Sequence, residues 1–353
     1  MSALDPLSHG SSQRKERIAY LDNARYWVML LVVVGHSLTE LVSMDSARGV
    51  YTWIYMFHMP FFVLISGYTA RGYTGSYSQV RRIVSTLIVP YLLVETTLQL
   101  ITRYYDGEPA QLMILSPQWL GWFLAALLVW RLTTPIWRTL KYPISVSVII
   151  SLTAGLIEIP NVLALPKILG LLPFYVLGLH FSKDILAQLT RTRVRIASWV
   201  VLISSFVACL LWAERWSERW PTSWLLWKHR YNEPPLSVDA IEGMITRGWV
   251  LTIAFVLTMA ALSVIPRTRS WTTAFGERTL YAYLLHGYVI LFLDRQFGLW
   301  EKIEPYGVVA VAGCILGGLI LANILMTSLI GKVFKPFFEP KLNWLFRRPP
   351  ARD

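Results

Sequence analysis

Long runs of apolar residues, separated by short polar segments, are the main pattern along this chain. A helix that crosses a bilayer needs about 20 mainly apolar residues, and its backbone groups must be paired within the helix because lipid offers them no partners. Each run is therefore predicted to be a transmembrane helix. We predict ten such helices, near residues 26–44, 53–70, 83–101, 119–137, 142–159, 163–182, 196–214, 244–265, 278–297 and 308–331.

The predicted fold is an all-α, polytopic transmembrane helical bundle that forms one domain. Its parts are a cytoplasmic N-terminal segment (1–25), a membrane domain (26–331) and a basic cytoplasmic tail (332–353). Pro160 and Pro166 leave only a very short turn between the fifth and sixth predicted helices. A broken or re-entrant pair is therefore the alternative to two full crossings at that point.

Composition supports a membrane location, because 55% of the 353 residues are hydrophobic and 15% are charged, against about 25% charged in soluble domains. Alternating the predicted spans across the bilayer places 23 of the 33 lysines and arginines on the side of the N-terminus. Sidedness, rather than nucleic-acid binding, therefore explains the net charge of +12, and both termini are predicted to be cytoplasmic in a plasma-membrane protein. Cys209 and Cys314 lie in apolar runs and indicate neither a disulfide nor a metal site.

We single out four ionisable side chains as lying at bilayer depth, where their cost makes them functional candidates: His36, His58, Glu95 and His286. His36 follows Arg25 by eleven residues, which places it about 16 Å along a helix from the basic membrane edge. A neutral imidazole can accept a proton, so His36 is a candidate general base, with Glu95 or another polar neighbour fixing its tautomer. Alternatively, these groups only lock neighbouring helices together. The histidines lack the spacing of a ligand pair such as HExxH, so no metal is expected.

Two sequence blocks carry a family resemblance. The stretch RIAYLDNARYWVMLLVVVGHSL (17–38) resembles the opening of the acyltransferase-3 family of integral membrane O-acyltransferases, and Arg25 and His36 fit its Arg-x10-His pattern. The stretches YMFHMPFFVLISGY and SQVRRIVSTLIVPYLL (55–68 and 78–93) are similar to spans two and three of the fucose 4-O-acetylase-related branch. Weaker matches to the family are WFLAALLVWRL (122–132), FYVLGLHF (174–181) and ERTLYAYLLHGYVI (277–290).

The resemblance implies an enzyme that takes an acetyl or similar acyl group from cytoplasmic acyl-CoA, with acetyl-CoA as the expected donor, and places it on a hydroxyl of a sugar or glycan. It implies that His36 is the catalytic histidine and that Arg25 is its partner in the Arg-x10-His motif. His58, in the block YMFHMPFFVLISGY, is a further position that matches the family. Glu95 and His286 complete the expected catalytic set. Many members carry an additional extracytoplasmic hydrolase-like domain; without one, this chain is expected to act alone or to pass its product to another protein.

The phosphates of acyl-CoA require cations at the cytoplasmic mouth, where Arg71, Arg81 and Arg82 precede the third predicted span. We expect these arginines to bind the donor; positive-inside anchoring is the alternative. His36 is expected either to deprotonate the acceptor hydroxyl or to carry the acyl group covalently. A proton-coupled transporter is the main rival function, because buried histidines also form proton relays, and a noncatalytic scaffold is a second rival.

Two further sequence patterns involve residues other than the expected catalytic and donor-binding ones. Tryptophans recur at helical spacing on the predicted outer side, and they indicate either an interfacial aromatic belt or a stacking platform for a sugar. These are Trp212, Trp216, Trp220, Trp224 and Trp227. Gly313 and Gly317 form a GxxxG pattern in the last predicted span, which predicts close helix packing.

Overall fold

The computed structural model describes residues 6–218 and 222–347, which form helices and no strand, so the all-α prediction is confirmed. The longer helices are α1 (Pro6–Ser37), α2 (Asp45–Ala70), α4 (Val89–Asp106), α5 (Gly121–Thr139), α6 (Pro143–Thr153), α7 (Leu165–His180), α9 (Thr192–Leu211), α11 (Ala240–Val264), α13 (Thr279–Phe297), α15 (Val308–Leu325) and α16 (Ser328–Phe338). The shorter ones are η1 (Thr39–Leu41), α3 (Tyr77–Ile83), the π-helical η2 (Val84–Ile88), η3 (Val162–Ala164), α8 (Lys183–Leu189), α10 (Ala213–Glu218), η4 (Thr222–Leu226), α12 (Trp271–Gly276), α14 (Leu299–Ile303) and η5 (Glu304–Tyr306).

Six helical segments of the described chain are long and apolar enough to cross a membrane, and each overlaps one of the ten predicted spans. They are Asp45–Ala70, Tyr77–Asp106, Val162–His180, Thr192–Leu211, Ala240–Val264 and Val308–Leu325. In the predicted fifth span, helix α6 has 11 residues and a length of about 16 Å, roughly half the thickness of a hydrocarbon core. The count of ten crossings and the side on which the termini lie stay predictions.

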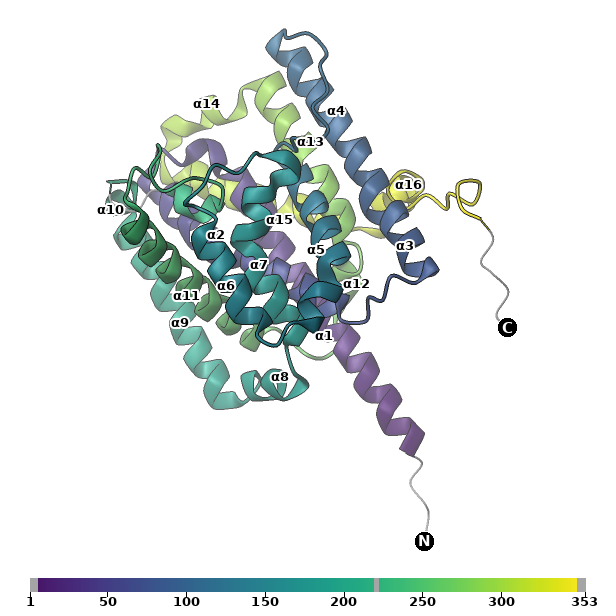
Figure 1. Cartoon of the computed structure of the whole chain (residues 1–353). Helices are drawn as coiled ribbons and strands as arrows, with labels where there is room; N and C mark the ends of the chain where they lie inside the picture. The colour runs from purple at the N-terminus through teal and green to yellow at the C-terminus, as the bar shows by residue number, and fades with distance from the viewer. Residues whose placement is uncertain (1–5, 219–221, 348–353) are drawn as a thin grey trace.

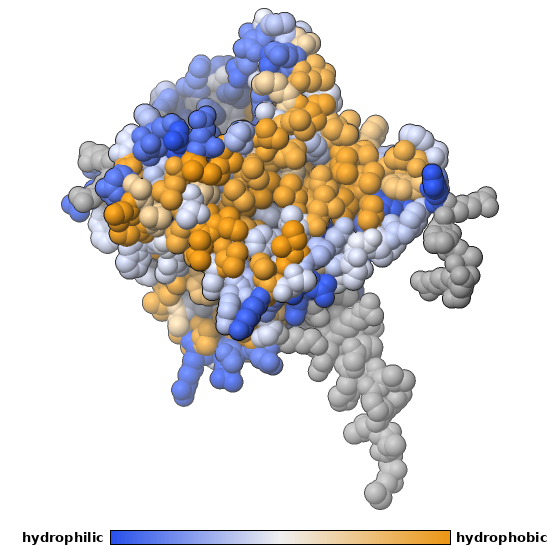
Figure 2. Space-filling model, in the orientation of Figure 1, coloured by the Kyte–Doolittle hydropathy of each residue, from blue (hydrophilic) through white to orange (hydrophobic). Residues whose placement is uncertain are grey.

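The outer surface of the bundle is strongly apolar. Figure 2 shows hydrophobic residues in a broad band across the visible face, with hydrophilic residues gathered toward its edges. On α9 and α15, Val200, Leu211 and Leu316 are all more than half exposed. Exposing so much contiguous apolar surface to water would cost free energy, whereas contact with lipid does not. This is therefore the surface of a membrane protein.

The helices divide into a central and a peripheral set. In the most apolar window of α2, 72% of the residues are buried, against 17% for α9, which lies beside α11 at the left of Figure 1. Helix α2 packs against α7, where Gly67 and Gly178 face the partner backbone. The absence of side chains at these two positions lets the backbones approach closely. The centre of the molecule is therefore the α2–α7 pair, flanked by α1.

Replacing Gly178 with alanine is expected to lower the free energy of unfolding by about 1–3 kcal/mol, because the core cannot accept the added methyl group. A Cβ atom at Gly178 would lie 2.1 Å from the carbonyl oxygen of Leu64 in α2. The matched control is Gly313→Ala, since a Cβ at Gly313 would meet nothing within 4 Å. Thermal unfolding in detergent checks the prediction, and equal midpoints for the two variants would contradict it.

The GxxxG prediction is wrong for packing within the described chain. A Cβ atom at Gly313 or Gly317 would meet nothing within 4 Å, whereas one at Gly318 would lie 3.1 Å from the Cα atom of Val34 in α1. One residue turns about 100° around a helix, so Gly318 belongs to a different face from its neighbour. Helix α15 therefore approaches α1 through Gly318.

The tryptophans that recur at helical spacing do not lie on one continuous helix. Helix α9 ends at Leu211, and Trp212 is 52% exposed, while Trp224 and Trp227 are buried at 4% and 2% exposure. Trp224 packs against the ring of Tyr231 inside the following loop. Trp220 lies outside the described residues. The rings therefore do not share one exposed face.

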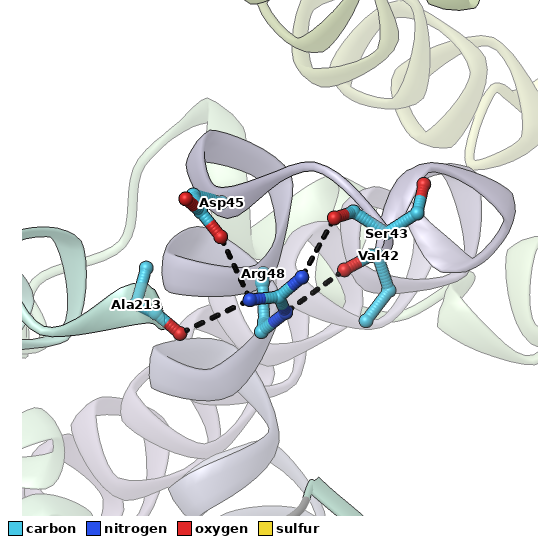
Figure 3. Close-up of polar contacts among 5 residues, drawn as sticks. All are labelled: Val42, Ser43, Asp45, Arg48 and Ala213. Atoms are coloured by element: carbon cyan, nitrogen blue, oxygen red, sulfur yellow. Dashed lines mark hydrogen bonds and ion pairs between the residues drawn. The ribbon is translucent and has the colours of Figure 1, made fainter. Parts of the chain in front are cut away.

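Arg48 fixes the turn that joins α1 to α2 (Figure 3). Its guanidinium donates to the backbone oxygens of Val42 (3.1 Å), Ser43 (2.6 Å) and Ala213 (3.3 Å), and it pairs with Asp45 at 2.7 Å. One side chain thus ties this turn to the start of α10. Because the turn directly follows the last residues of α1, this clamp helps to set where α1 ends.

Candidate active site

Two histidines from opposite ends of the chain meet in the bundle. His36 lies in the last turn of α1 and His286 in α13, with His36 Nδ1 2.9 Å from His286 Nε2. His286 Nδ1 lies 2.8 Å from the carbonyl oxygen of Ala282, which can only accept, so this nitrogen carries the proton. His286 Nε2 is then an acceptor, and His36 Nδ1 must donate to it. The lone pair of His36 Nε2 is left for chemistry.

Trp119 covers the ring of His36. The two rings are stacked, with centroids 5.6 Å apart and planes 28° from parallel. His286 is fully buried behind the pair, whereas His36 retains partial exposure. The backbone of Trp119 has φ of 29°, in the left-handed region that a bulky residue rarely adopts. Such a conformation persists only where neighbouring contacts enforce it.

Glu95 supplies one of those contacts. Its Oε1 accepts from the backbone N–H of Gln118 (2.8 Å) and from Nε2 of Gln99 (2.6 Å), and Gln99 Oε1 accepts from the N–H of Met113 (2.8 Å). The hydroxyl of Tyr283 donates to the carbonyl of Leu120 on the other side of Trp119. Glu95 thus holds the loop that carries Trp119. His286, rather than Glu95, contacts the His36 ring, so Glu95 is a positioning residue.

Replacing Glu95 with leucine is expected to lower the rate of acyl transfer by about 10-fold and the free energy of unfolding by about 1–3 kcal/mol, because the N–H of Gln118 loses its buried acceptor. Glu95→Gln keeps an oxygen there and is expected to stay within about threefold of the wild-type rate. Initial rates and thermal unfolding of both variants check this. If the glutamine variant were as slow as the leucine variant, the charge of Glu95 itself would be required.

His58 and Lys167 complete this side of the site. His58 is buried in α2, and its Nδ1 lies 2.9 Å from the carbonyl of Ile54, so Nδ1 donates and Nε2 keeps a lone pair. Both His58 and Lys167 are close enough to His36 for a direct electrostatic interaction. The ammonium of Lys167 lies 4.6 Å from the ring centre of Trp122. The three predicted histidines therefore gather in one region.

Sequence reasoning missed Lys167 and Trp119 as site residues. Lys167 falls inside the predicted span 163–182, where a cation is costly and signals a role, so the signal was present. Trp119 had no comparable signal, because a tryptophan at a span boundary is common in membrane proteins.

The middle of α1 is fixed by Asn23, which is fully buried. Its Nδ2 donates to the carbonyl oxygens of Pro266 (2.9 Å) and Thr268 (3.0 Å), and its Oδ1 accepts from the hydroxyls of Thr272 (2.8 Å) and Thr273 (2.7 Å). These contacts tie α1 to the loop before α12 and to the first turn of α12. They set the position of Arg25, half a turn further along α1.

Arg25 belongs to a cluster of cations. It pairs with Asp22 at 2.8 Å, and both Arg25 and Arg82 lie within electrostatic range of Arg131 on α5. Arg131 is partly buried, and its Nε has no hydrogen-bond partner among the described residues. Sequence reasoning had not assigned Arg131 to the site. We call Arg25, Arg82 and Arg131 the arginine cluster.

The three arginines expected to bind the donor are not one group. Arg82 joins the arginine cluster, whereas Arg71 lies over the ring of Tyr68, 4.9 Å from its centre. Arg81 donates to the carbonyl oxygen of Lys341 at 2.9 Å and so faces the C-terminal tail. Of the expected set, Arg82 therefore shares with Arg25 an electrostatic interaction with Arg131.

Comparisons with known proteins show the family to which the chain belongs. The acyltransferase-3 family model, described as an acyltransferase domain, matches residues 18–327. The nodulation protein NolL of Sinorhizobium fredii (strain NBRC 101917 / NGR234) is 25% identical over 350 residues, which cover 94% of this chain and 95% of NolL. No solved structure matches the chain. The resemblance carried by Arg25 and His36 is thereby confirmed, and the chain belongs to the acyltransferase-3 family of membrane O-acyltransferases.

Proposed function

We propose that the protein moves an acetyl or short acyl group from cytoplasmic acyl-CoA to a hydroxyl of a sugar or glycan of the cell envelope, with His36 as general base or acyl relay. The observation that supports this most directly is the free lone pair of His36 Nε2. The contact with His286 holds His36 in this tautomer, because His286 Nε2 can only accept. A base with a fixed tautomer that is held against a ring suits proton abstraction from a hydroxyl.

The arginine cluster supports a donor site about three turns before His36 along α1. Guanidinium groups bind phosphate through paired hydrogen bonds, and acyl-CoA is rich in phosphate. Arg131 offers a buried Nε with no partner among the described residues. Arg25 and His36 are eleven residues apart on one helix, a rise of about 16 Å. An extended pantetheine arm along α1 would carry the thioester from the cluster toward His36.

In the general-base form of the reaction, His36 Nε2 takes the proton from the acceptor hydroxyl as its oxygen attacks the thioester carbon. The C–O bond forms, the C–S bond breaks, and the proton passes from His36 to the departing thiolate of CoA. In the relay form, Nε2 attacks the thioester carbon, the C–S bond breaks, and CoA leaves as a thiolate that takes a proton from water. The hydroxyl oxygen then attacks the acyl carbon, the C–N bond breaks, and the hydroxyl proton is released to water. In both forms His286 accepts the hydrogen bond from His36 Nδ1 and stabilises positive charge on that ring.

Purified protein in oriented lipid vesicles tests the proposal. Labelled acetyl-CoA is added on one face and a panel of soluble glycosides is supplied to both faces. The expected result is one CoA thiol released for each label transferred, only with donor on the face that carries the termini. Donor use from the other face alone would contradict the assigned side. Movement of glycoside across the bilayer with the thioester intact would contradict the reaction and favour a transporter.

A further inference from the structure

A polar cavity of about 180 Å³ lies between the end of α6, the start of α7 and the loop before α11. We call it the Arg247 pocket. Its lining includes Glu158, Trp227, Lys228, His229, Arg230 and Arg247. A cavity of this volume holds about six waters at liquid density, which is room for an acidic group and part of a sugar ring.

Arg247 is buried in α11 without a carboxylate partner in the part of the chain that the structure describes. It is 2% exposed, and its guanidinium lies 3.5 Å from the carbonyl oxygen of Ser151 and 3.4 Å from that of His229. It also lies over the rings of Tyr231 and Trp227, 5.1 and 5.9 Å from their centres. Its Nε makes no hydrogen bond to any described residue. A buried charge without a counter-ion is costly, so the site is complementary to an anion that the protein itself does not supply.

Two other arginines with little exposed side-chain surface, Arg48 and Arg103, are paired with carboxylates. Arg48 pairs with Asp45 at 2.7 Å and Arg103 with Glu108 at 3.0 Å. The contrast shows that the chain places carboxylates beside such cations elsewhere, so the lone guanidinium of Arg247 is a local feature of the pocket.

The carboxylates of the pocket are already engaged. Arg230 pairs with Glu233 and, at 3.8 Å, with Glu158. Burial, together with the nearby cations Lys228, Arg247 and Lys167, lowers the pKa of His229 to about 4, so His229 is neutral at pH 7. Lys228 and Arg247 therefore leave an excess of positive charge in the pocket.

The pocket also offers a neutral donor. Trp227 is buried, and its indole N–H has no hydrogen-bond acceptor among the described residues. An indole nitrogen can only donate, as can a guanidinium or an ammonium. Unmatched donors of this kind are complementary to the oxygens of a carboxylate or a phosphate.

Lys167 links the pocket to the histidine site. It follows Pro166, which lines the cavity, and it interacts electrostatically with His229 on one side and with His36 on the other. Lys167 is therefore within electrostatic range of both the pocket and His36. An acceptor anchored at Arg247 would have to reach past Lys167 to place a hydroxyl at His36 Nε2. Resting on the acyl transfer proposed above, we propose that the Arg247 pocket binds an oxyanion of the acceptor, so that the enzyme acylates acidic sugars in preference to neutral ones.

Equilibrium binding without donor tests the pocket separately from the reaction. The probes are methyl β-D-glucuronide, glucose 1-phosphate and methyl β-D-glucoside, titrated into the full chain in nanodiscs. At least one anionic probe is expected to bind about tenfold or more tightly than the neutral glucoside. A preference for the glucuronide or for the phosphate would identify the acidic group. Equal affinity for all three probes would overturn the inference.

Substitutions in and outside the pocket test whether the anionic probe binds at the Arg247 pocket. Arg247→Gln is expected to remove the preference for the anionic probe. Lys228 is exposed, so Lys228→Glu avoids a folding defect and is expected to weaken anion binding severalfold. Lys302→Glu, the same charge change at another exposed lysine, is the control and is expected to have no effect. Anion binding that is unchanged in the Lys228 and Arg247 variants would overturn the assignment.

Rates of acyl transfer to acidic and neutral acceptors distinguish a failure of the anion site from a failure of acyl transfer. If label moves equally well to acidic and neutral acceptors, and Arg247→Gln leaves their ratio of kcat/KM unchanged, the pocket inference fails while acyl transfer stands. If the anionic probe binds through Arg247 but acetyl-CoA is never consumed with any acceptor, acyl transfer fails while the anion site stands. In the expected case, Arg247→Gln raises KM for the acidic acceptor and leaves KM for acetyl-CoA unchanged.

Discussion

Replacing His36 with alanine is expected to lower the rate of acyl transfer by about 10³-fold, because the substitution removes the base or acyl carrier from the site. Folding is expected to survive, since His36 is partly exposed and its loss leaves one hydrogen bond of His286 unmade, at a cost of about 1 kcal/mol. Label transfer from acetyl-CoA and thermal unfolding are measured on the same preparation.

The control for this variant is His180→Ala, which removes an exposed imidazole whose Nε2 lies 3.2 Å from the carbonyl of Trp137. It is expected to leave the rate unchanged. Adding free imidazole should restore part of the activity of His36→Ala, because Trp119 provides a stacking surface for the added ring. Wild-type rates in the His36 variant, without imidazole, would remove this residue from its role.

A rapid-quench measurement distinguishes the two forms of the reaction. In the relay form, the enzyme releases one CoA thiol per chain before any acceptor is added, because the imidazole itself takes the acyl group. In the general-base form, no CoA is released until a hydroxyl is supplied. The structure supports both, since the same lone pair of His36 Nε2 serves as base or nucleophile.

The sequence predicted well those features that depend on the lipid solvent. Apolar runs located the helices, because each backbone must pair internally in lipid. Ionisable residues inside those runs located His36, His58 and His286, because such groups are tolerated only where they act or pair. The motif spacing of Arg25 and His36 placed both on α1, and the helix itself fixes the distance between them.

The sequence did not predict which side chains meet. The contact between His36 and His286 joins residues 250 positions apart, and it depends on the rotation of α1 and α13 about their axes. A glycine pattern that repeats every four residues predicted packing at Gly313, but the packed glycine is Gly318. The loop conformation that brings Trp119 over His36 has no periodic signal. Helix rotation and loop geometry are set by the whole core, so local patterns cannot determine them.

Replacing His286 with leucine is expected to lower kcat by about 10²-fold, although His286 does not touch the substrate. Without its acceptor, His36 Nδ1 no longer needs the proton, which can move to Nε2 and occupy the reactive lone pair. KM for acetyl-CoA is expected to stay unchanged, because the arginine cluster lies about 16 Å away along α1. A purely structural role for His286 would instead lower the amount of folded protein and leave kcat per folded molecule unchanged.

Two further variants show whether the effect of His286 passes through the tautomer of His36. His286→Gln can place an amide oxygen where Nε2 lies and is expected to recover at least about tenfold of the lost rate, because that oxygen accepts from His36 Nδ1. The double variant His36→Ala with His286→Leu is expected to be no slower than His36→Ala alone, since residues that act as one unit are not additive. Additive losses, or a glutamine variant as slow as the leucine variant, would show that His286 contributes independently of the tautomer of His36.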